Sequence, residues 1–364
     1  MNINRRHFLM GLAALGGLGG IFTHQYLAQS SSLKTPIEEK KSTSSQKVVT
    51  DNSVSETSQI PPNVRIVLIS DLNSQYGSTS YEPEVHQAIA LIPELKPDLI
   101  LCAGDSIAGQ KLSLTNSQIK AMWAAFDRDI GEKIRDLGIP YGFTIGNHDG
   151  SGGIVKGNLV FKRERKLASE YWNDPQHTPK LNFIDRAQFP FYYSFKEKDI
   201  FFLVWDASTN LISQQQLTWA EKSLASDAAQ KAKMRVVLGH LPLYAVAVGR
   251  NKPGAYLHNA TSLQMLLERY GVHTYISGHH HAYYPGKKGQ LQLLHAGALG
   301  GGPRKLLNSN LPPRKTLTLL DIDLSSTTTV YTTYNMKTKE VISDRSLPQV
   351  IVSPNGKIYR RDLT

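Results

Sequence analysis

The side chains best suited to chemistry in this sequence are carboxylates, carboxamides and imidazoles that follow short apolar runs. In residues 67–73 an apolar run ends at Asp71, and Asn73 lies two positions later. Such a run, stopped by a polar residue, predicts a buried β-strand that carries this residue at its C-terminal end. The pattern recurs at residues 99–105, 141–149, 235–240 and 274–281.

The side chains collected in this way include three carboxylates, two carboxamides and several imidazoles. They are Asp71, Asn73, Asp105, Asn147, His148, Asp149, His240, His279, His280 and His281. A folded core does not gather such groups at one sheet edge unless positive charge holds them together, and metal ions are the simplest source. Two divalent cations about 3.5–4 Å apart would polarise a phosphoryl oxygen and lower the pKa of a shared water molecule. The sequence therefore predicts a dinuclear metal centre with a bridging carboxylate.

The five stretches also resemble, in order, the motifs of the calcineurin-like metallophosphoesterases. The matching segments are Asp71-Leu72-Asn73, Gly104-Asp105, Gly146-Asn147-His148-Asp149, Gly239-His240 and Gly278-His279-His280-His281. The resemblance covers residues 61–335 and departs from the family pattern at Asn73, where the family usually has histidine. It implies an α/β (α+β) fold of four layers, in which two mixed β-sheets pack face to face and are flanked by helices.

The resemblance also implies a set of metal ligands. Asp71, Asn73 and His281 would bind the first metal, Asp105 would bridge, and Asn147, His240 and His279 would bind the second. Asn73 would coordinate through its amide oxygen, which is a weaker donor than imidazole, so we expect lower affinity at the first site. The mixture of nitrogen and oxygen ligands suits divalent or trivalent Mn, Fe or Zn ions.

The remaining motif residues are expected to act on the substrate. His148 would donate a proton or hydrogen bond to the leaving oxygen, with Asp149 fixing its ring. Asn147 and His148 would contact the substrate, whereas His280, between two ligands, would point away. The expected reaction is hydrolysis of phosphate mono- or diesters by direct attack of a metal-bound hydroxide, without a covalent enzyme intermediate.

Two alternatives to this function remain open at this stage. Because Asn73 departs from the pattern, the chain could be a metal- or ligand-binding protein of the same fold with reduced or lost activity. It could also be a membrane-surface hydrolase of lipid-linked phosphates, which the basic surplus and the N-terminal segment described below would favour.

Several other features have two interpretations each. His258 and His295 could reach the cleft, but surface or packed positions are favoured. Backbone N–H groups of the loop 297–303 could lie near a phosphate, or the loop could be an ordinary connection. The basic run 162–166 is typical of a solvated helix face, although it could form the rim of an anion site. Tyr76 is an aromatic candidate near the metals.

The N-terminal segment resembles a twin-arginine export signal. Arg5-Arg6 is followed by Phe8-Leu9 and an apolar, glycine-rich run to residue 22, which is short for a stable membrane span. We therefore expect residues 1–29 to be a signal or an N-terminal anchor with possible membrane association, recognised by the twin-arginine export machinery. The protein would then act in the periplasm or an equivalent extracytoplasmic space.

Composition is compatible with one large folded domain. The chain has 364 residues, 40% of them hydrophobic, and a net charge of +11. Residues 30–60 are polar and predict a flexible linker, residues 61–335 the phosphoesterase-like domain, and residues 336–364 a C-terminal extension. Cys102, the single cysteine, lies in an apolar run and is expected to pack in the core. The sequence contains no basic stripe interleaved with aromatic residues, so we expect no nucleic-acid binding.

The periodicity of the sequence also predicts individual elements. We expect helices over 83–95, 117–137 and 262–269 and one starting near 213, a hairpin over 191–205, and strands near 291–294, 316–323 and 327–334. The order of strand, helix and strand in the first half favours a layered α/β core.

Overall fold

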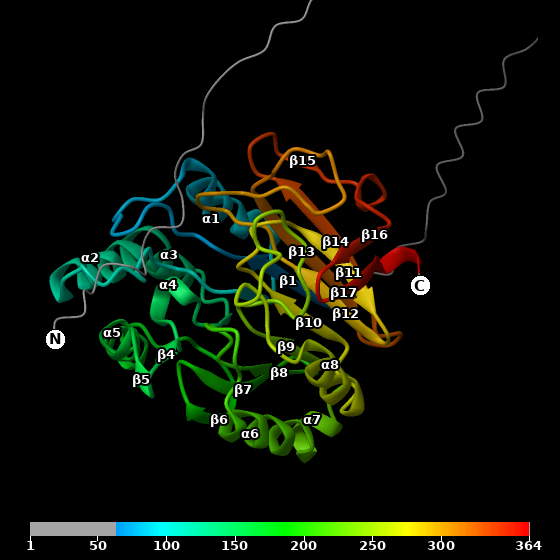
Figure 1. Ribbon diagram of the computed structural model, residues 1–364, viewed down its shortest axis with the longest axis horizontal. Helices are drawn as coiled ribbons and strands as arrows, with labels where there is room; N and C mark the ends of the chain where they lie inside the picture. Colours follow the sequence, from blue (N-terminus) through cyan, green and yellow to red (C-terminus); the bar gives the residue numbers. More distant parts are fainter. Residues whose placement is uncertain (1–62, 364) are drawn as a thin grey trace, which may run out of the picture. The chain divides into compact units, whose positions relative to one another are not determined.

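The computed structural model describes residues 63–363 and contains two large mixed β-sheets (Figure 1). The strands of the first sheet are β1 (Val64–Ile69), β2 (Leu99–Cys102), β3 (Tyr141–Phe143), β13 (Thr316–Asp323), β14 (Thr328–Asn335) and β15 (Glu340–Val341). They lie side by side in the order β15-β14-β13-β1-β2-β3. Each of the first three follows the apolar pattern read from the sequence.

The second sheet is larger and draws on the second half of the chain. Its strands are β6 (Phe183–Gln188), β7 (Tyr192–Glu197), β8 (Ile200–Val204), β9 (Met234–Leu238), β10 (Thr274–Ser277), β11 (Tyr284–Lys288), β12 (Leu291–His295), β16 (Val350–Ser353) and β17 (Gly356–Arg360). Their order is β16-β17-β11-β12-β10-β9-β8-β7-β6. A separate short hairpin joins β4 (Ile154–Val155) to β5 (Asn158–Leu159).

Each sheet contains a block of parallel strands, and this orientation positions the site. In the first sheet β1 pairs in parallel with β2, and β2 with β3. In the second, β8, β9, β10 and β12 are parallel neighbours. Parallel strands end at the same edge of their sheet. The loops after β1, β2 and β3 therefore lie at one edge of the first sheet, and the loops after β9 and β10 lie at one edge of the second. These loops carry the predicted ligands.

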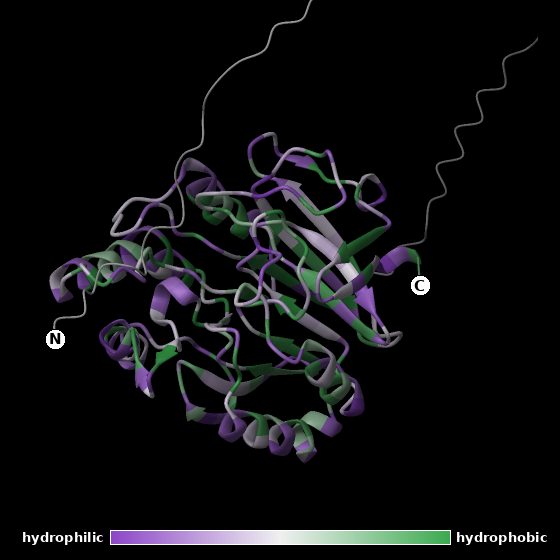
Figure 2. Ribbon diagram, viewed as in Figure 1, coloured by the Kyte–Doolittle hydropathy of each residue, from purple (hydrophilic) through white to green (hydrophobic). Residues whose placement is uncertain are grey.

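The two sheets contact each other through their inner faces. Tyr193 on β7 donates its hydroxyl proton to the carbonyl of Phe143 on β3 at 2.5 Å and accepts from the Phe143 N–H at 3.1 Å. A Cβ placed on Gly142 of β3 would lie only 2.7 Å from Cζ of Phe195 on β7, so glycine permits this close approach. Figure 2 shows the inner strands to be predominantly hydrophobic, as sheet-on-sheet packing requires. The predicted arrangement of two packed mixed sheets flanked by helices is confirmed.

Helices connect the strands and cover the outer faces. They are α1 (Pro83–Leu95), α2 (Asn116–Phe126), α3 (Glu132–Asp136), α4 (Asn147–Gly150), α5 (Lys162–Asn173), α6 (Gln214–Leu224), α7 (Asp227–Gln230) and α8 (Ala260–Arg269). Pro83 is the first residue of α1, where its missing N–H costs nothing. The helix predicted over 117–137 is divided, because a π-helical turn at Asp127–Gly131 joins α2 to α3. No helix within residues 63–363 has the length and apolar character needed to cross a membrane.

The C-terminal part of the predicted domain organisation can be placed in the fold. Residues 336–364, expected to be an extension, contribute to both large sheets within the described part: β15 pairs with β14, and β17 pairs with β11. Cys102 is a free, buried thiol on β2, as expected. The predicted signal and linker, residues 1–29 and 30–60, lie outside the described residues.

Candidate metal centre

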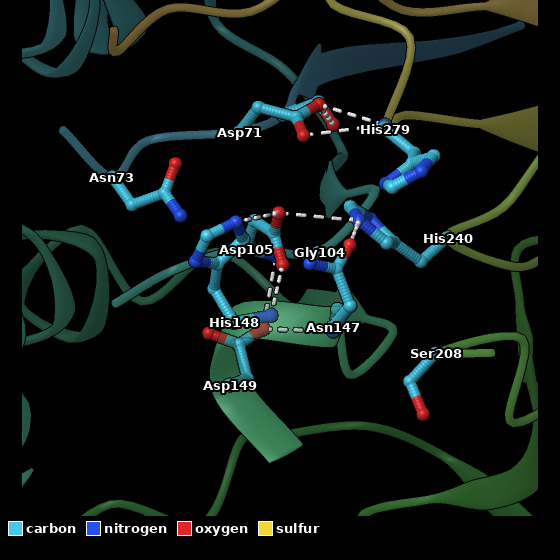
Figure 3. A network of polar contacts seen from close by, with 12 residues as sticks. Asp71, Asn73, Gly104, Asp105, Asn147, His148, Asp149, Ser208, His240 and His279 are labelled. Atoms are coloured by element: carbon cyan, nitrogen blue, oxygen red, sulfur yellow. Dashed lines mark hydrogen bonds and ion pairs between the residues drawn. The ribbon is translucent and has the colours of Figure 1, made fainter. Parts of the chain in front are cut away.

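The loops after the five parallel strands bring the predicted ligands together (Figure 3). Asp105, His240 and His279 have ligand atoms that all lie within 4.8 Å of one another. The same is true of Asp71, Asp105 and His281. All five residues are buried. Because Asp105 belongs to both groups, its carboxylate is placed where a ligand bridging two metal ions would be.

Four of these ligands have a backbone conformation that residues other than glycine rarely adopt. The φ angle is 50° at Asp71, 58° at Asp105, 61° at His279 and 53° at His281. Asp71 and His279 lie two residues after the ends of β1 and β10, Asp105 three residues after the end of β2, and His281 two residues after His279. Strained left-handed residues of this kind persist where the surrounding structure fixes them, and they gather at functional sites.

The first half of the centre contains Asp71 and His281. Asp71 accepts a hydrogen bond from the Ser70 hydroxyl at 2.6 Å and from the His279 N–H at 3.1 Å. Nδ1 of His281 lies 3.0 Å from the carbonyl oxygens of Gly301 and Gly302, so the ring proton belongs on Nδ1. Nε2 of His281, 3.1 Å from Oδ1 of Asp71, then presents its lone pair to the centre, as in metal-binding histidines.

The second half is organised by hydrogen bonds behind the ligands. Nδ1 of His240 lies 2.8 Å from the Ala103 carbonyl oxygen, which places the ring proton on Nδ1 and the lone pair on Nε2. That lone pair faces Oδ1 of Asn147 at 3.0 Å and Oδ2 of Asp105 at 3.2 Å. Three electron-rich atoms directed at one another repel unless positive charge lies between them. The arrangement therefore fits a cation.

Two further observations agree with bound cations. Oδ2 of Asp105 and Nδ1 of His279 are buried and have no hydrogen-bond partner, although buried polar atoms are almost always satisfied. Burial would lower the pKa of His240, but the Asp105 carboxylate raises it to about 9. Burial would likewise raise the pKa of Asp105, and it is nevertheless lowered by His240 and His148. In the chain without metal, this pocket demands positive charge.

Asn147 is oriented by a residue that the sequence did not reveal. Its Nδ2 donates to Oε1 of Gln110 at 2.6 Å, which directs Oδ1 toward Nε2 of His240. Gln110 lies in the loop after Asp105 and has a φ of 65°. No motif marks it, and only the three-dimensional arrangement identifies it as the group that sets the Asn147 amide.

Asn73 is buried beside the first half of the centre. Its Nδ2 donates to the Ile107 carbonyl at 3.2 Å. Since the amino group is engaged there, the amide oxygen is the atom left to coordinate a cation. The ligand role of Asn73 stays a prediction, in which this oxygen would replace an imidazole nitrogen.

His148 lies next to the centre but outside both ligand groups. Its backbone N–H donates to Oδ1 of Asp105 at 2.8 Å, and its ring Nε2 is 3.9 Å from Oδ2 of Asp105. Nδ1 lies 3.2 Å from the Gly109 carbonyl oxygen, and the ring is 5.1 Å from that of Tyr76. Gly109 and Tyr76 therefore hold the imidazole, with Nε2 directed toward the metal-binding carboxylate.

The role expected for Asp149 needs correction. Its Oδ2 accepts hydrogen bonds from the N–H groups of Asp105 at 2.9 Å and Gly146 at 2.8 Å, and Oδ1 accepts from Ile107 at 2.9 Å. The carboxylate therefore fixes the backbone of the loops that carry the ligands, and the His148 ring is held by other groups. Burial, followed by repulsion from Asp105, raises the pKa of Asp149 to about 7 in the chain without metal.

The motif glycines allow these loops to approach one another. A Cβ on Gly146 would overlap the Asp105 carboxylate, and one on Gly278 would lie 2.7 Å from Oδ2 of Asp71. Glycine is therefore required on sterics alone at both positions, and a ligand could not follow so closely after any larger residue.

Three histidine predictions can be compared with the structure. His280 points away from the centre: Nδ1 accepts from the Val246 N–H at 3.2 Å, and Nε2 lies 2.9 Å from the Ala255 carbonyl oxygen. His295 is buried between two carbonyl oxygens, each 3.3 Å away, whereas His258 is exposed. None of the three joins either ligand group.

The interpretations of the loop 297–303 and of the basic run 162–166 can also be compared with the structure. In the loop 297–303 the N–H groups of Leu299, Gly300 and Gly301 donate to the carbonyls of Ser70, Asp71 and Asn73. They support the backbone of the first ligand loop, so these three N–H groups are already engaged and favour the interpretation as a connecting loop. The basic run 162–166 begins helix α5, where Arg165 pairs with Asp206 at 2.7 Å.

A cavity of about 340 Å³ adjoins the second half of the centre. Asn147 and His279 reach its wall from the metal side. Its other lining residues are Gln110, Ser151, Ser208, Thr209, Leu241, Gly249, Arg250, Lys252, Pro253, Gly254 and Ala255. Its volume lies in the range of small-molecule pockets.

Comparisons with known proteins agree with this geometry. A family model described as calcineurin-like phosphoesterase matches residues 64–283. Among solved structures, the purple acid phosphatase PPD1 from yellow lupin seeds (Lupinus luteus) is 19% identical with a TM-score of 0.54, covering 77% of this chain and 52% of that one. The chain thus spans about half the length of the lupin protein. Among curated protein sequences, none matches.

Two further solved structures are similar at lower scores. GAP50, the anchor in the inner membrane complex of Plasmodium, is 14% identical, with a TM-score of 0.49 over 77% of this chain and 87% of that one. A dimetal phosphatase from Danio rerio is 13% identical, with a TM-score of 0.47 over 71% of this chain and 93% of that one.

Proposed function

The chain belongs to the calcineurin-like phosphoesterase family, and from this we propose that it hydrolyses phosphate esters at a dinuclear metal centre. The observation that carries the proposal is the pair of ligand groups that share Asp105. A single-metal site would not need a carboxylate common to two clusters. The buried Oδ2 of Asp105 and Nδ1 of His279, which lack hydrogen-bond partners, supply donor atoms for the ions.

The ligands divide between two ions. Asp71, Asn73 and His281 would hold the first, Asn147, His240 and His279 the second, and Asp105 would bridge them. When bound, such ions polarise a phosphoryl oxygen and lower the pKa of a water molecule. Mn, Fe and Zn all suit this mixture of nitrogen and oxygen donors.

The side chains of the protein position the ester and supply the proton. The phosphorus–oxygen bond to the leaving group breaks as one to a water oxygen forms, so the leaving oxygen must gain a proton. In its imidazolium form His148 donates Nδ1–H to the Gly109 carbonyl. Its Nε2–H then remains to protonate the leaving oxygen of the ester. Asn147 would also contact the phosphoryl group, since Gln110 holds its amide at the edge of the cavity. General acid catalysis of this kind contributes about 10²–10⁴-fold to a rate.

Turnover with defined esters tests the proposal. The purified protein, loaded in turn with Mn, Fe and Zn, would be assayed with p-nitrophenyl phosphate and bis(p-nitrophenyl) phosphate, and its metal content measured. We expect about two ions per chain and hydrolysis of at least one ester, and the two esters separate monoesterase from diesterase activity. Binding of metal without turnover of either ester by any loaded form would instead favour a metal-binding protein of this fold.

We further propose export by the twin-arginine route, on the basis of Arg5-Arg6 and the apolar run that follows. Replacing both arginines by lysine should leave the protein in the cytoplasm, and cell fractionation would detect the change. Unaltered export of that variant would contradict the proposal. If the N-terminal segment is retained and the protein hydrolyses phospholipid headgroups in vesicles, the membrane-surface alternative is favoured.

A further inference from the structure

Part of the wall of this cavity carries positive charge from residues that are not metal ligands. Arg250 and Lys252 line this wall and come from the loop between β9 and α8. Asn147 and His279 line the metal side of the same cavity. A molecule with one group bound to the metal ions would therefore extend past the side chains of Arg250 and Lys252.

The charge of Arg250 is not neutralised by the protein. Its Nε is buried and has no hydrogen-bond partner. Within residues 63–363 no carboxylate lies within ion-pair distance of Arg250 or Lys252. Two other partly buried arginines are, by contrast, paired: Arg165 with Asp206 at 2.7 Å, and Arg360 with Asp362 at 2.6 Å.

A second arginine increases the positive potential behind this wall. Nη1 of Arg304 would lie 3.3 Å from a Cβ placed on Gly249, so Arg304 packs against the loop that carries Arg250. Its Nε is also buried without a hydrogen-bond partner. Burial and the neighbouring Arg250 lower the pKa of Arg304. Two like charges held together at low solvent exposure are costly, and an anion is the group that would stabilise them.

We propose that the substrate carries a second anionic group, either a carboxylate or another phosphate, which Arg250 and Lys252 bind in the cavity beside the metal centre. This inference rests on the proposed function, because it assigns the first phosphate to the metals. The planar guanidinium matches both carboxylate and phosphate oxygens, and the ammonium of Lys252 adds a mobile charge at the exposed side. Arg304 acts from behind by raising the local potential.

Three aryl esters separate this proposal from simple attraction of anions. The probes are phenyl phosphate, 4-carboxyphenyl phosphate and 1,4-phenylene bisphosphate, so that only the group opposite the scissile phosphate differs. For the wild-type protein we expect KM to be about tenfold lower for at least one two-anion probe than for phenyl phosphate, since hydrogen bonds to charged groups are individually strong. The better of the two identifies the second group as carboxylate or phosphate.

Charge-removing variants locate the effect. Arg250→Gln should raise KM for the preferred two-anion probe about tenfold more than for phenyl phosphate, and Lys252→Gln should do so by a smaller factor. Arg250→Lys should restore part of the preference. Lys233→Gln, which removes one exposed charge outside the cavity, should leave the ratio of the KM values unchanged. Equal effects of Arg250→Gln on all three probes, or no wild-type preference, would overturn the proposal.

A binding experiment makes the result independent of turnover. Calorimetry on metal-loaded protein would compare phenylphosphonate with 4-phosphonobenzoate and 1,4-phenylenebisphosphonate, which are not hydrolysed. At least one two-anion compound should bind about tenfold more tightly to the wild type, and the gain should be lost in Arg250→Gln. If no ester is hydrolysed but this difference is found, the proposed function fails and the anion site stands. Equal affinities for all three compounds would refute the anion site.

Discussion

The two halves of the metal centre are built differently although they share Asp105. In the second half, Ala103 fixes the His240 ring and Gln110 fixes the Asn147 amide. In the first half, two carbonyl oxygens fix the His281 ring, and Asn73 would supply an amide oxygen. The comparison teaches that the two proposed ligand sets each contain one amide but differ in their nitrogen donors, because the second has two imidazoles where the first has one. We therefore expect the second half to bind its metal more tightly.

Removing the shared ligand should weaken both halves of the metal centre and have the largest effect on activity. In Asp105→Asn one carboxamide replaces a carboxylate that contacts both groups, while the shape and the acceptor for the His148 N–H remain. We expect both metals to be weakened and kcat/KM to fall by at least about 10³-fold, because the ions supply several kcal/mol of transition-state stabilisation. Metal analysis and ester hydrolysis measure the two effects. A variant that retained two ions would show that Asp105 does not bridge.

Removing one ligand from each half should separate the two sites. His240→Ala should lose the second ion and His281→Ala the first, each lowering kcat by about 10²-fold or more. The pair is matched, since each variant deletes one imidazole whose Nδ1 faces a backbone carbonyl. Metal titration followed by calorimetry would give one remaining site in each variant, with the tighter site retained in His281→Ala. Retention of the tighter site in His240→Ala would reverse the assignment.

His148 tests whether catalysis can be separated from metal binding. Because the ring belongs to neither ligand group, His148→Ala should lower kcat by about 10²-fold while both halves keep their ions. The deficit should be smaller for esters whose leaving oxygen needs no proton, such as p-nitrophenyl phosphate, than for alkyl esters. Loss of metal from this variant would place His148 among the ligands.

The smallest effect is expected from a substitution that removes the difference in donor strength between the two halves. Asn73→His should raise the affinity of the first half for Zn or Mn about tenfold, since imidazole is the stronger donor. A control, Asn73→Ala, should lower the same affinity and leave the second half unaffected. A titration unchanged in both variants would show that Asn73 is not a ligand.

The sequence was most informative where a ligand directly follows an apolar strand. The ends of β1, β2, β3, β9 and β10 could be read in this way, because each strand is buried and short and its polar successor breaks the pattern. The order of the motifs then indicated one centre, which is why Asp71 and His281, 210 positions apart in the numbering, could be assigned together.

Contacts across loops could not be read in the same way. Asp149 is the third residue of α4, and the position of an acid in a first turn favours bonds to the preceding backbone N–H groups. This local signal favours backbone contacts over the predicted contact with His148. Gln110 has no comparable signal, since its contact with Asn147 depends on the path of a loop. The π-helical turn after α2 and the strands after residue 335 likewise depend on tertiary packing.

The pairing of β1 has a consequence for how the protein is made. One neighbour of β1 is β2, but the other is β13, in the register Val64 with Ile322. A ribosome adding about 5–20 residues per second needs roughly 10–50 s to travel between these two positions. During that interval one long edge of an apolar strand stays open to mispairing with other nascent chains. A lower expression level, which reduces the number of nascent chains that can meet, or a chaperone that covers this edge, should therefore raise the soluble yield.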